Sequence, residues 1–187
     1  MSEMRYTRGS RGFTLIEVLI TVLILAIGLL GLASLQMTSL NSQVEAYQRA
    51  QAVLLLEDMA NRIRANAVAA KAGDYIVGAQ YGLLTEEDCS TKTDAAARDL
   101  CEWNIALAGS GVTLGAENVG SVLAARGCIE NIAGSTDGET NIRLTIAWQG
   151  MTPTKAPSSS CGLDQYGDPD SLRRTASLDT VLANLAL

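Results

Sequence analysis

The side chains that could support chemistry in this 187-residue chain are few, and their types exclude several functional classes. The sequence has no histidine, which removes imidazole general bases, histidine-containing zinc sites and a Ser-His-Asp triad. It has no G-x-x-x-x-G-K-[ST] phosphate loop, and the glycines at 109–111 are expected to lie in a loop. The net charge of -6 argues against a nucleic-acid partner, because such proteins carry basic patches. The composition therefore favours a protein without catalytic activity.

Four cysteines are the main reactive groups: Cys89, Cys101, Cys128 and Cys161. No C-x-x-C spacing occurs, so a zinc site or a thioredoxin-like redox motif is poorly supported. Four cysteines allow three disulfide pairings. We favour Cys89–Cys101, which is short-range, together with Cys128–Cys161, which would pin a long loop to a strand. Loops of these sizes predict a stabilisation of roughly 3 kcal/mol or slightly more for each disulfide.

Three aspartates cluster in a loop late in the chain, at Asp164, Asp168 and Asp170. Carboxylate oxygens are ligands for Ca²⁺, but this spacing matches no standard calcium-binding loop. Aspartate is also a common turn residue, because its side chain bonds to nearby backbone groups. We therefore expect these residues to shape turns, and we expect neither a metal nor another cofactor.

One carboxylate, Glu17, interrupts an otherwise apolar run from Phe13 to Leu35. As a helix these 23 residues would be about 34 Å long, which is enough to cross the roughly 30 Å hydrocarbon layer of a bilayer. A charged group at the centre of a membrane helix costs about 2.5–3.5 kcal/mol, and less near an end, so it usually marks function and needs a partner. Thr14 and Glu17 also have the spacing of a helix capping box, which would make Glu17 a cap.

The positive charge before the apolar run predicts how this segment would be oriented across the membrane. Residues 1–12 carry three arginines, Arg5, Arg8 and Arg11, against one glutamate. Basic residues keep that end in the cytoplasm, so the rest of the chain is expected outside it, where disulfides persist. A cleaved secretory signal with a cut before Ser34 is one alternative, although its apolar core would normally be only about 7–15 residues. A plain membrane anchor is another.

The stretch RGFTLIEVLI, residues 11–20, resembles the class III leader junction of type IV pilins and of type II secretion pseudopilins. The resemblance implies that prepilin peptidase removes residues 1–12 by cutting after Gly12. Phe13 would then be the N-methylated first residue, and Glu17 the fifth, where the family carries a glutamate. The continuation down the helix, and more weakly residues 166–185, look like minor pilins of the PilV type.

The resemblance implies a minor pilin that helps to initiate the type IV pilus and is incorporated at its tip or in its priming complex. Glu17 would pair there with the amine of a neighbouring subunit. The implied partners are prepilin peptidase, other minor pilins, the major pilin, the pilus assembly platform and a pilus-tip adhesin. The implied location is the inner membrane, with a single pass and a periplasmic carboxyl-terminal domain, and then the pilus. The alternatives are a minor pseudopilin of a type II secretion system and a membrane-anchored periplasmic enzyme.

The helix is expected to run on to about residue 72, with residues 13–35 in the membrane and filament core and 36–72 as an amphipathic continuation. Lys71 and Gly73 provide a carboxyl-terminal stop. Apolar residues recur at helical spacing and predict one buried stripe. Its members are Met37, Leu40, Val44, Tyr47, Leu54 or Leu55, Met59 and Ile63. The i,i+4 pairs Glu45–Arg49 and Asp58–Arg62 are expected to support the exposed face.

Residues 73–187 are expected to form a globular head. Residues 94–107 have helical spacing with Trp103 in the core, and 108–121 are expected to be a Gly-rich loop. Strands are predicted over 125–132 and 141–149 with a hairpin turn at Asp137-Gly138. In the second strand the residues that share one face are Ile142, Leu144, Ile146 and Trp148.

The last segments are a long loop over 150–171 and the residues 173–182. Over 173–187 a helical spacing is present in Leu178, Val181, Leu182 and Leu185, but the resemblance favours a strand over about 173–182, which we expect. The fold class is therefore α+β: a type IV pilin fold whose long amino-terminal helix packs on a small antiparallel sheet.

Overall fold

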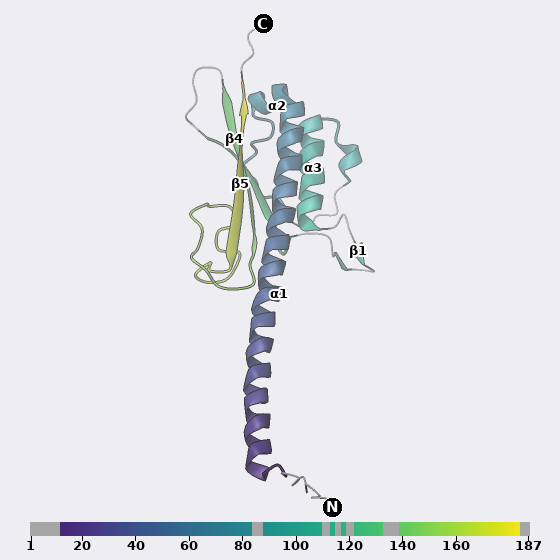
Figure 1. Cartoon of the computed structure of the whole chain (residues 1–187). Helices are drawn as coiled ribbons and strands as arrows, with labels where there is room; N and C mark the ends of the chain where they lie inside the picture. Colours follow the sequence, from purple (N-terminus) through teal and green to yellow (C-terminus); the bar gives the residue numbers. More distant parts are fainter. Residues whose placement is uncertain are drawn as a thin grey trace, which may run out of the picture. The chain divides into compact units, whose positions relative to one another are not determined.

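The computed structural model describes residues 12–83, 88–109, 113–114, 117–118, 122–132 and 139–183 (Figure 1). Two compact units divide the chain, Met1–Ser42 and Gln43–Leu187. The helix α1, Leu15–Ala65, contributes to both of them.

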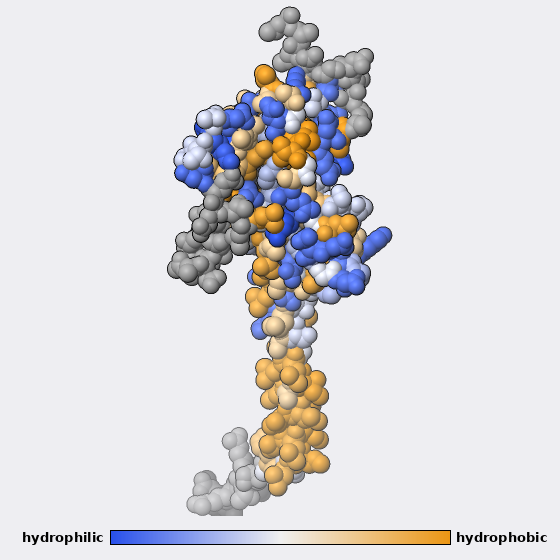
Figure 2. Space-filling view, turned by 180° about the vertical axis from the view of Figure 1, so that it is seen from behind, coloured by the Kyte–Doolittle hydropathy of each residue, from blue (hydrophilic) through white to orange (hydrophobic). Residues whose placement is uncertain are grey.

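The first unit is the apolar part of α1. Between Phe13 and Leu35 every large apolar side chain is at least half exposed, and Figure 2 shows this stretch as continuously hydrophobic. Gly28 and Gly31 are helical, and an added Cβ at either would meet nothing within 4 Å. By length and composition, α1 is the one helix in the described part of the chain that could cross a membrane. An exposed apolar surface of this length is typical of a region that contacts lipid or other proteins.

The second unit begins with the rest of α1, which ends earlier than predicted. Instead of one helix to residue 72, α1 stops at Ala65 and a short helix α2, Ala67–Ala72, follows Asn66. The Asn66 amide donates a hydrogen bond to the Tyr75 hydroxyl at 3.2 Å, and its backbone leaves the helical region. Asparagine is also a weaker helix former than most residues, which favours an interruption at this position. Gly73 ends α2 in the left-handed conformation, as the predicted stop requires.

The predicted helix near residue 100 is confirmed as α3, Ala95–Ala108, which follows a short 3₁₀ helix η1, Cys89–Thr91. The Asp94 carboxylate caps α3 by accepting the Ala97 N–H at 2.9 Å, and Gly109 ends it with a positive φ. Trp103 is fully buried, as expected, and its indole N–H donates to the Leu55 carbonyl at 3.0 Å. That bond fixes α3 against α1.

The expected antiparallel sheet is present, in the order β3-β4-β5. Its strands are β3 Arg126–Asn131, β4 Thr140–Gln149 and β5 Arg173–Leu182. The strand prediction for the last segment is confirmed and the helical alternative is wrong, because β5 pairs with β4 from Thr140↔Leu182 to Gln149↔Arg173. The turn predicted at Asp137-Gly138 lies outside the described residues.

The prediction that residues 108–121 form only a loop is wrong. Two short strands, β1 Thr113–Leu114 and β2 Glu117–Asn118, pair antiparallel within it. Strands of two residues are too short for an alternating pattern to show in the sequence. The expected loop over 150–171 is confirmed, since no helix or strand lies in it.

The core of the second unit lies where α3 and one face of the sheet pack on α1 (Figure 1). Ile142, Leu144 and Ile146 are fully buried and Trp148 is 3 % exposed, so the predicted inner face of β4 is confirmed. The predicted α1 stripe is only partly right. Met59 and Ile63 are buried, and Leu55, the alternative to Leu54, is half-buried against the core. The other members are exposed, namely Met37, Leu40, Val44, Tyr47 and Leu54.

The buried face of α1 is instead made by Gln48, Ala52, Leu56, Met59, Ala60 and Ile63. Two of these six residues are alanines, and they are fully buried. A pattern that weights large apolar residues does not detect them.

The two predicted ion pairs on α1 have different outcomes. Asp58–Arg62 is confirmed at 2.9 Å, and Arg62 also contacts Asp99 and Glu102 of α3. The prediction of Glu45–Arg49 is wrong, because the Glu45 carboxylate contacts Arg174 of β5 at 3.1 Å. A long-range partner of this kind cannot be read from helical spacing.

Candidate functional site

The proposed leader junction lies just before α1. Gly12 and Phe13 precede the first helical residue, Leu15, and Phe13 is 82 % exposed. An added Cβ at Gly12 would meet nothing within 4 Å. Residues 1–11 lie outside the described part of the chain. The Gly12–Phe13 peptide bond is therefore on exposed, non-helical backbone, which a protease can bind.

Glu17 lies in the first turn of α1 and is exposed. Its N–H donates to the Thr14 backbone carbonyl at 3.1 Å, and no side-chain bond of a capping box forms between the two residues. Within the described residues the Glu17 carboxylate has neither a hydrogen bond nor an ion pair. The capping interpretation is therefore not supported. The helix dipole favours a negative charge at this end.

The surroundings of Glu17 define what it can do. It is the only charged side chain of the described residues from 12 to 44, and apolar side chains surround it along the helix. In lipid or between packed helices such a carboxylate is costly unless a cation neutralises it. This part of α1 can thus bind other helices through apolar packing and a cationic group through Glu17.

The head carries two disulfides. Cys89–Cys101 links η1 to α3 with a Cα–Cα distance of 5.6 Å, and Cys128–Cys161 links β3 to the late loop at 5.9 Å. These are the pairs favoured from the sequence. No cysteine is left free in the structure.

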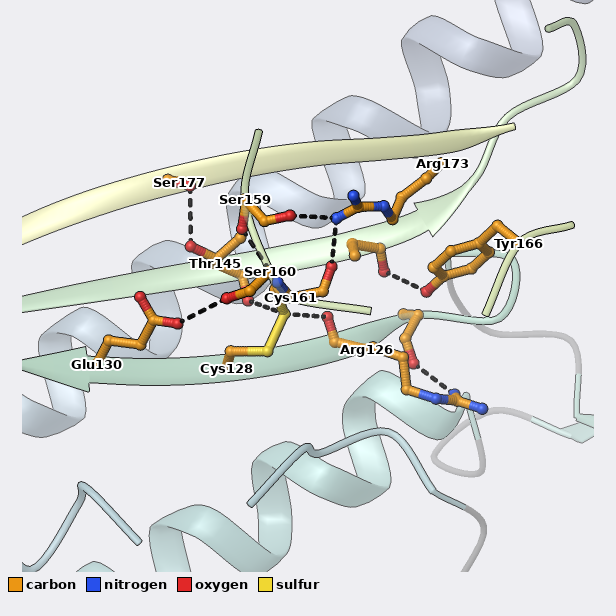
Figure 3. The surroundings of a disulfide bond; sticks show 12 residues. Arg126, Cys128, Glu130, Thr145, Ser159, Ser160, Cys161, Tyr166, Arg173 and Ser177 are labelled. Atoms are coloured by element: carbon orange, nitrogen blue, oxygen red, sulfur yellow. Dashed lines mark hydrogen bonds between the residues drawn. A yellow bond between two sulfur atoms is a disulfide. The ribbon is translucent and has the colours of Figure 1, made fainter. Parts of the chain in front are cut away.

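The second disulfide anchors residues 150–172, here called the outer loop, over the face of the sheet that lies away from α1. A small second core of Cys128, Ala147, Cys161 and Tyr166 lies beneath it (Figure 3). The Tyr166 hydroxyl lies 2.8 Å from the Ala124 carbonyl and 3.0 Å from that of Ala147. Burial raises the pKa of Tyr166 to about 12, so the hydroxyl remains a donor at neutral pH.

Arg173 organises the outer loop from within. Its side chain is 1 % exposed, and its Nε lies 2.6 Å from the Asp170 carboxylate. It donates to the carbonyls of Ser159 and Cys161, as Figure 3 shows, and to that of Pro157 at 3.1 Å. We did not identify Arg173 as important from the sequence. The only sequence feature that could have indicated its role is its position at the start of a strand, close to three aspartates.

The aspartates of the outer loop serve turns, as expected. Asp164 and Asp170 have positive φ values of 60° and 65°, and the Asp164 N–H donates to Asp170 at 3.2 Å. Asp164 and Asp168 are exposed. Within the described residues no group of three potential metal ligands comes together.

Removing the second disulfide should destabilise the head more than removing the first. Chain-entropy arithmetic gives about 4 kcal/mol for the 33-residue separation of Cys128 and Cys161, and about 3 kcal/mol for the 12-residue separation of Cys89 and Cys101. Denaturant unfolding of the two double-serine variants measures the difference, with non-reduced wild type as the reference. An equal loss in both variants would contradict this order.

Two family models match the chain. Residues 34–106 match the family described as Type IV pilin Tt1218, and residues 7–33 match the prokaryotic N-terminal methylation motif. No curated protein and no solved structure matches it. The second match includes Gly12, Phe13 and Glu17, and the first extends over most of α1 and α3 but not over the three-stranded sheet. Together with a long amino-terminal helix, whose residues 48–63 pack in one core with a small antiparallel sheet, these matches show the type IV pilin fold.

Proposed function

From the type IV pilin fold and the prepilin-type methylation motif, we propose that this protein is a minor pilin of the PilV type. It would help to initiate the type IV pilus and be incorporated at the tip or in the priming complex. The match at residues 7–33 carries the proposal, because it includes the junction and the first part of a helix whose apolar surface has no cover within the described chain. Pilins are structural proteins, and the site offers no constellation that favours an enzyme.

Maturation would begin at the Gly12–Phe13 bond. Prepilin peptidase would remove residues 1–12 on the cytoplasmic side, and the new amine of Phe13 would be methylated. What supports this step is the exposed, non-helical backbone at the junction and the basic residues before it. The mature chain would remain in the inner membrane by α1, with the head in the periplasm, where both disulfides could form.

Assembly would then use the apolar face of α1. Helices of other minor pilins and of the major pilin would cover the exposed apolar residues, and the amine of a neighbouring subunit would pair with Glu17. The assembly platform and a pilus-tip adhesin complete the set of proposed partners. The free carboxylate in an apolar surface supports this use of Glu17.

Mass spectrometry of the protein from cells tests the processing step. We expect a mature chain that begins at N-methylated Phe13. Gly12→Val should leave the leader attached, because the peptidase must fit the residue before the cut. Ser10→Ala is the control, since it keeps Gly12 and the arginines, and it should be processed normally. A mature amino terminus at Ser34 or Met1 would overturn the pilin interpretation.

The location of the protein in the cell distinguishes a minor pilin of a type IV pilus from a pseudopilin of a type II secretion system. A minor pilin should appear in pili that are sheared from the cell surface. A pseudopilin of a type II secretion system should instead co-purify with secretion proteins from the envelope. Processing at Phe13 is expected in both cases and does not discriminate between them.

A further inference from the structure

β5 is an outermost strand of the three-stranded sheet, and Figure 3 shows it in yellow with β4 on one side only. In an antiparallel sheet the backbone groups of successive residues point alternately to the two sides of a strand. The Gly150 N–H donates to the Leu172 carbonyl at 2.7 Å, in continuation of the β4–β5 register. Even-numbered residues of β5 therefore bond to β4, and odd-numbered residues direct their N–H and C=O groups to the other side.

The two ends of that outer edge are occupied by other parts of the chain, and its middle is not. Before β5, the Ser171 carbonyl accepts the Thr154 N–H at 2.8 Å, and after it the Ala183 carbonyl accepts a bond from Lys71 at 2.7 Å. Water can solvate the backbone groups between them, and a β-strand is the kind of segment that could replace this water along the whole row. The odd-numbered residues of this row are Thr175, Ser177, Asp179 and Val181, of which the last three are exposed.

This part of β5 lacks the features that usually protect a sheet edge. Proline, lysine and β-bulges are the common means of blocking the addition of another strand. Residues 175–181 contain neither proline nor lysine, and the β4–β5 register runs through both strands without a bulge. The one charged residue in the stretch, Asp179, is held by Arg143 through two bonds of 2.8 Å. The edge is therefore regular, and its charge is already neutralised.

The direction of β5 argues against a second copy of this chain as the partner. Glu45 of α1 contacts Arg174 at 3.1 Å, and Arg64, farther along α1, donates to the Thr180 hydroxyl at 3.0 Å. β5 thus runs along this part of α1 in the same direction. Copies whose α1 helices cross one membrane in the same sense would also hold β5 in the same sense. Their β5 edges could not pair antiparallel, which is the more stable arrangement.

We propose that the open edge of β5, residues 175–181, binds an extended segment of a different protein chain as a fourth strand of the sheet. The backbone of that segment supplies the hydrogen bonds. Ala176 and Leu178 are half-buried against the core on the α1 side of the edge, so apolar side chains at alternate positions of the segment would cover them. An uncharged segment fits best, because Asp179 already has its counter-ion. The inference rests on the proposed function only in that the partner belongs to the same assembly.

Hydrogen exchange with residue-level mass spectrometry tests the edge in two states of the full chain. In detergent micelles the amides of Thr175, Ser177 and Asp179 should exchange at least about tenfold faster than those of Ala176 and Leu178, which bond to β4. In the native assembly, sheared pili or an envelope complex, the first three amides should slow by about tenfold or more. Exchange there at the rate found in micelles would overturn the proposal. Protection in micelles that grows with protein concentration would also overturn it, because a second copy would then be the occupant.

Ser177→Pro tests the backbone contact directly. It removes an outward N–H and no bond to β4, and proline is tolerated at such positions of an edge strand. Ser177→Ala is the matched control: both variants lose the hydroxyl that lies 2.9 Å from the Thr145 hydroxyl, but alanine keeps the N–H. The proline variant should lose the protection at Thr175 and Asp179 in the assembly, whereas the alanine variant should keep it. Exchange in the centre of β4 should be the same in both. Equal protection of the edge in the two variants would overturn the proposal.

The same samples separate this inference from the proposed function. A chain that begins at Phe13 and enters pili with an unprotected β5 edge would overturn the fourth strand and leave the minor pilin in place. A chain that is absent from pili but protected at the edge in an envelope complex would support the fourth strand and overturn the assignment to the pilus.

Discussion

A Glu17→Lys chain should reach the membrane and lose its leader, yet be missing from surface pili. The carboxylate has no partner among the described residues, and every large apolar side chain around it is at least half exposed. In a filament core, lysine would place a cation against the neighbouring amine. At 4 Å and an effective dielectric of about 20, two such charges repel by about 4 kcal/mol, which is more than a hundredfold in an equilibrium.

Glu17→Gln should show a smaller loss in the same direction, because it removes the attraction without adding repulsion. Immunoblots of sheared pili against whole cells, together with co-purification of other minor pilins, measure both variants. Thr14→Ala is the control, since it removes the hydroxyl that a capping box would need and leaves the carboxylate in place, and it should assemble like the wild type. Wild-type recovery of both Glu17 variants would mean that this carboxylate has no role in assembly.

Elements with a strong local pattern could be predicted from the sequence. The alternation of Ile142, Leu144 and Ile146 predicted β4 and its inner face, and the Asp94 cap with Gly109 bounds the predicted α3. Elements defined by distant partners could not be predicted in this way. Glu45 pairs with Arg174, 129 residues away, and not with Arg49, which lies one turn along the helix.

The buried face of α1 shows why burial is harder to predict than helix formation. Tyr47 and Leu54 have the right period and are exposed, whereas Ala52 and Ala60 are fully buried. Alanine side chains are small, and their low hydrophobicity gives little signal in a pattern of apolar residues. The candidate site, in contrast, is easier to predict from the sequence than burial is. Glu17 is conspicuous in the sequence because it interrupts an apolar run, and the structure adds that its carboxylate is free of partners in the described chain.

The sequence gives little indication that Arg173 is important for the structure. Arg173→Met should nevertheless lower the stability of the head more than any other single substitution. It removes the donors to the carbonyls of Pro157, Ser159 and Cys161, and it leaves Asp170, which is 5 % exposed, without its counter-ion. Breaking a buried ion pair from one side costs about 3–5 kcal/mol, since the remaining charge is uncompensated. Denaturant unfolding with both disulfides intact measures the loss.

The matched control is Arg143→Met, which makes the same substitution in an ion pair with Asp179 that is nearly half exposed on each side. Water already solvates that pair, so its loss should change stability little. Asp170→Asn in the Arg173→Met background should restore part of the stability, because it removes the uncompensated charge while the lost carbonyl donors stay lost. If Arg173→Met were as mild as Arg143→Met, the outer loop would be held by the Cys128–Cys161 disulfide and the Tyr166 contacts without help from the buried guanidinium. If the double variant recovered nothing, the cost would lie in the three carbonyls and not in Asp170.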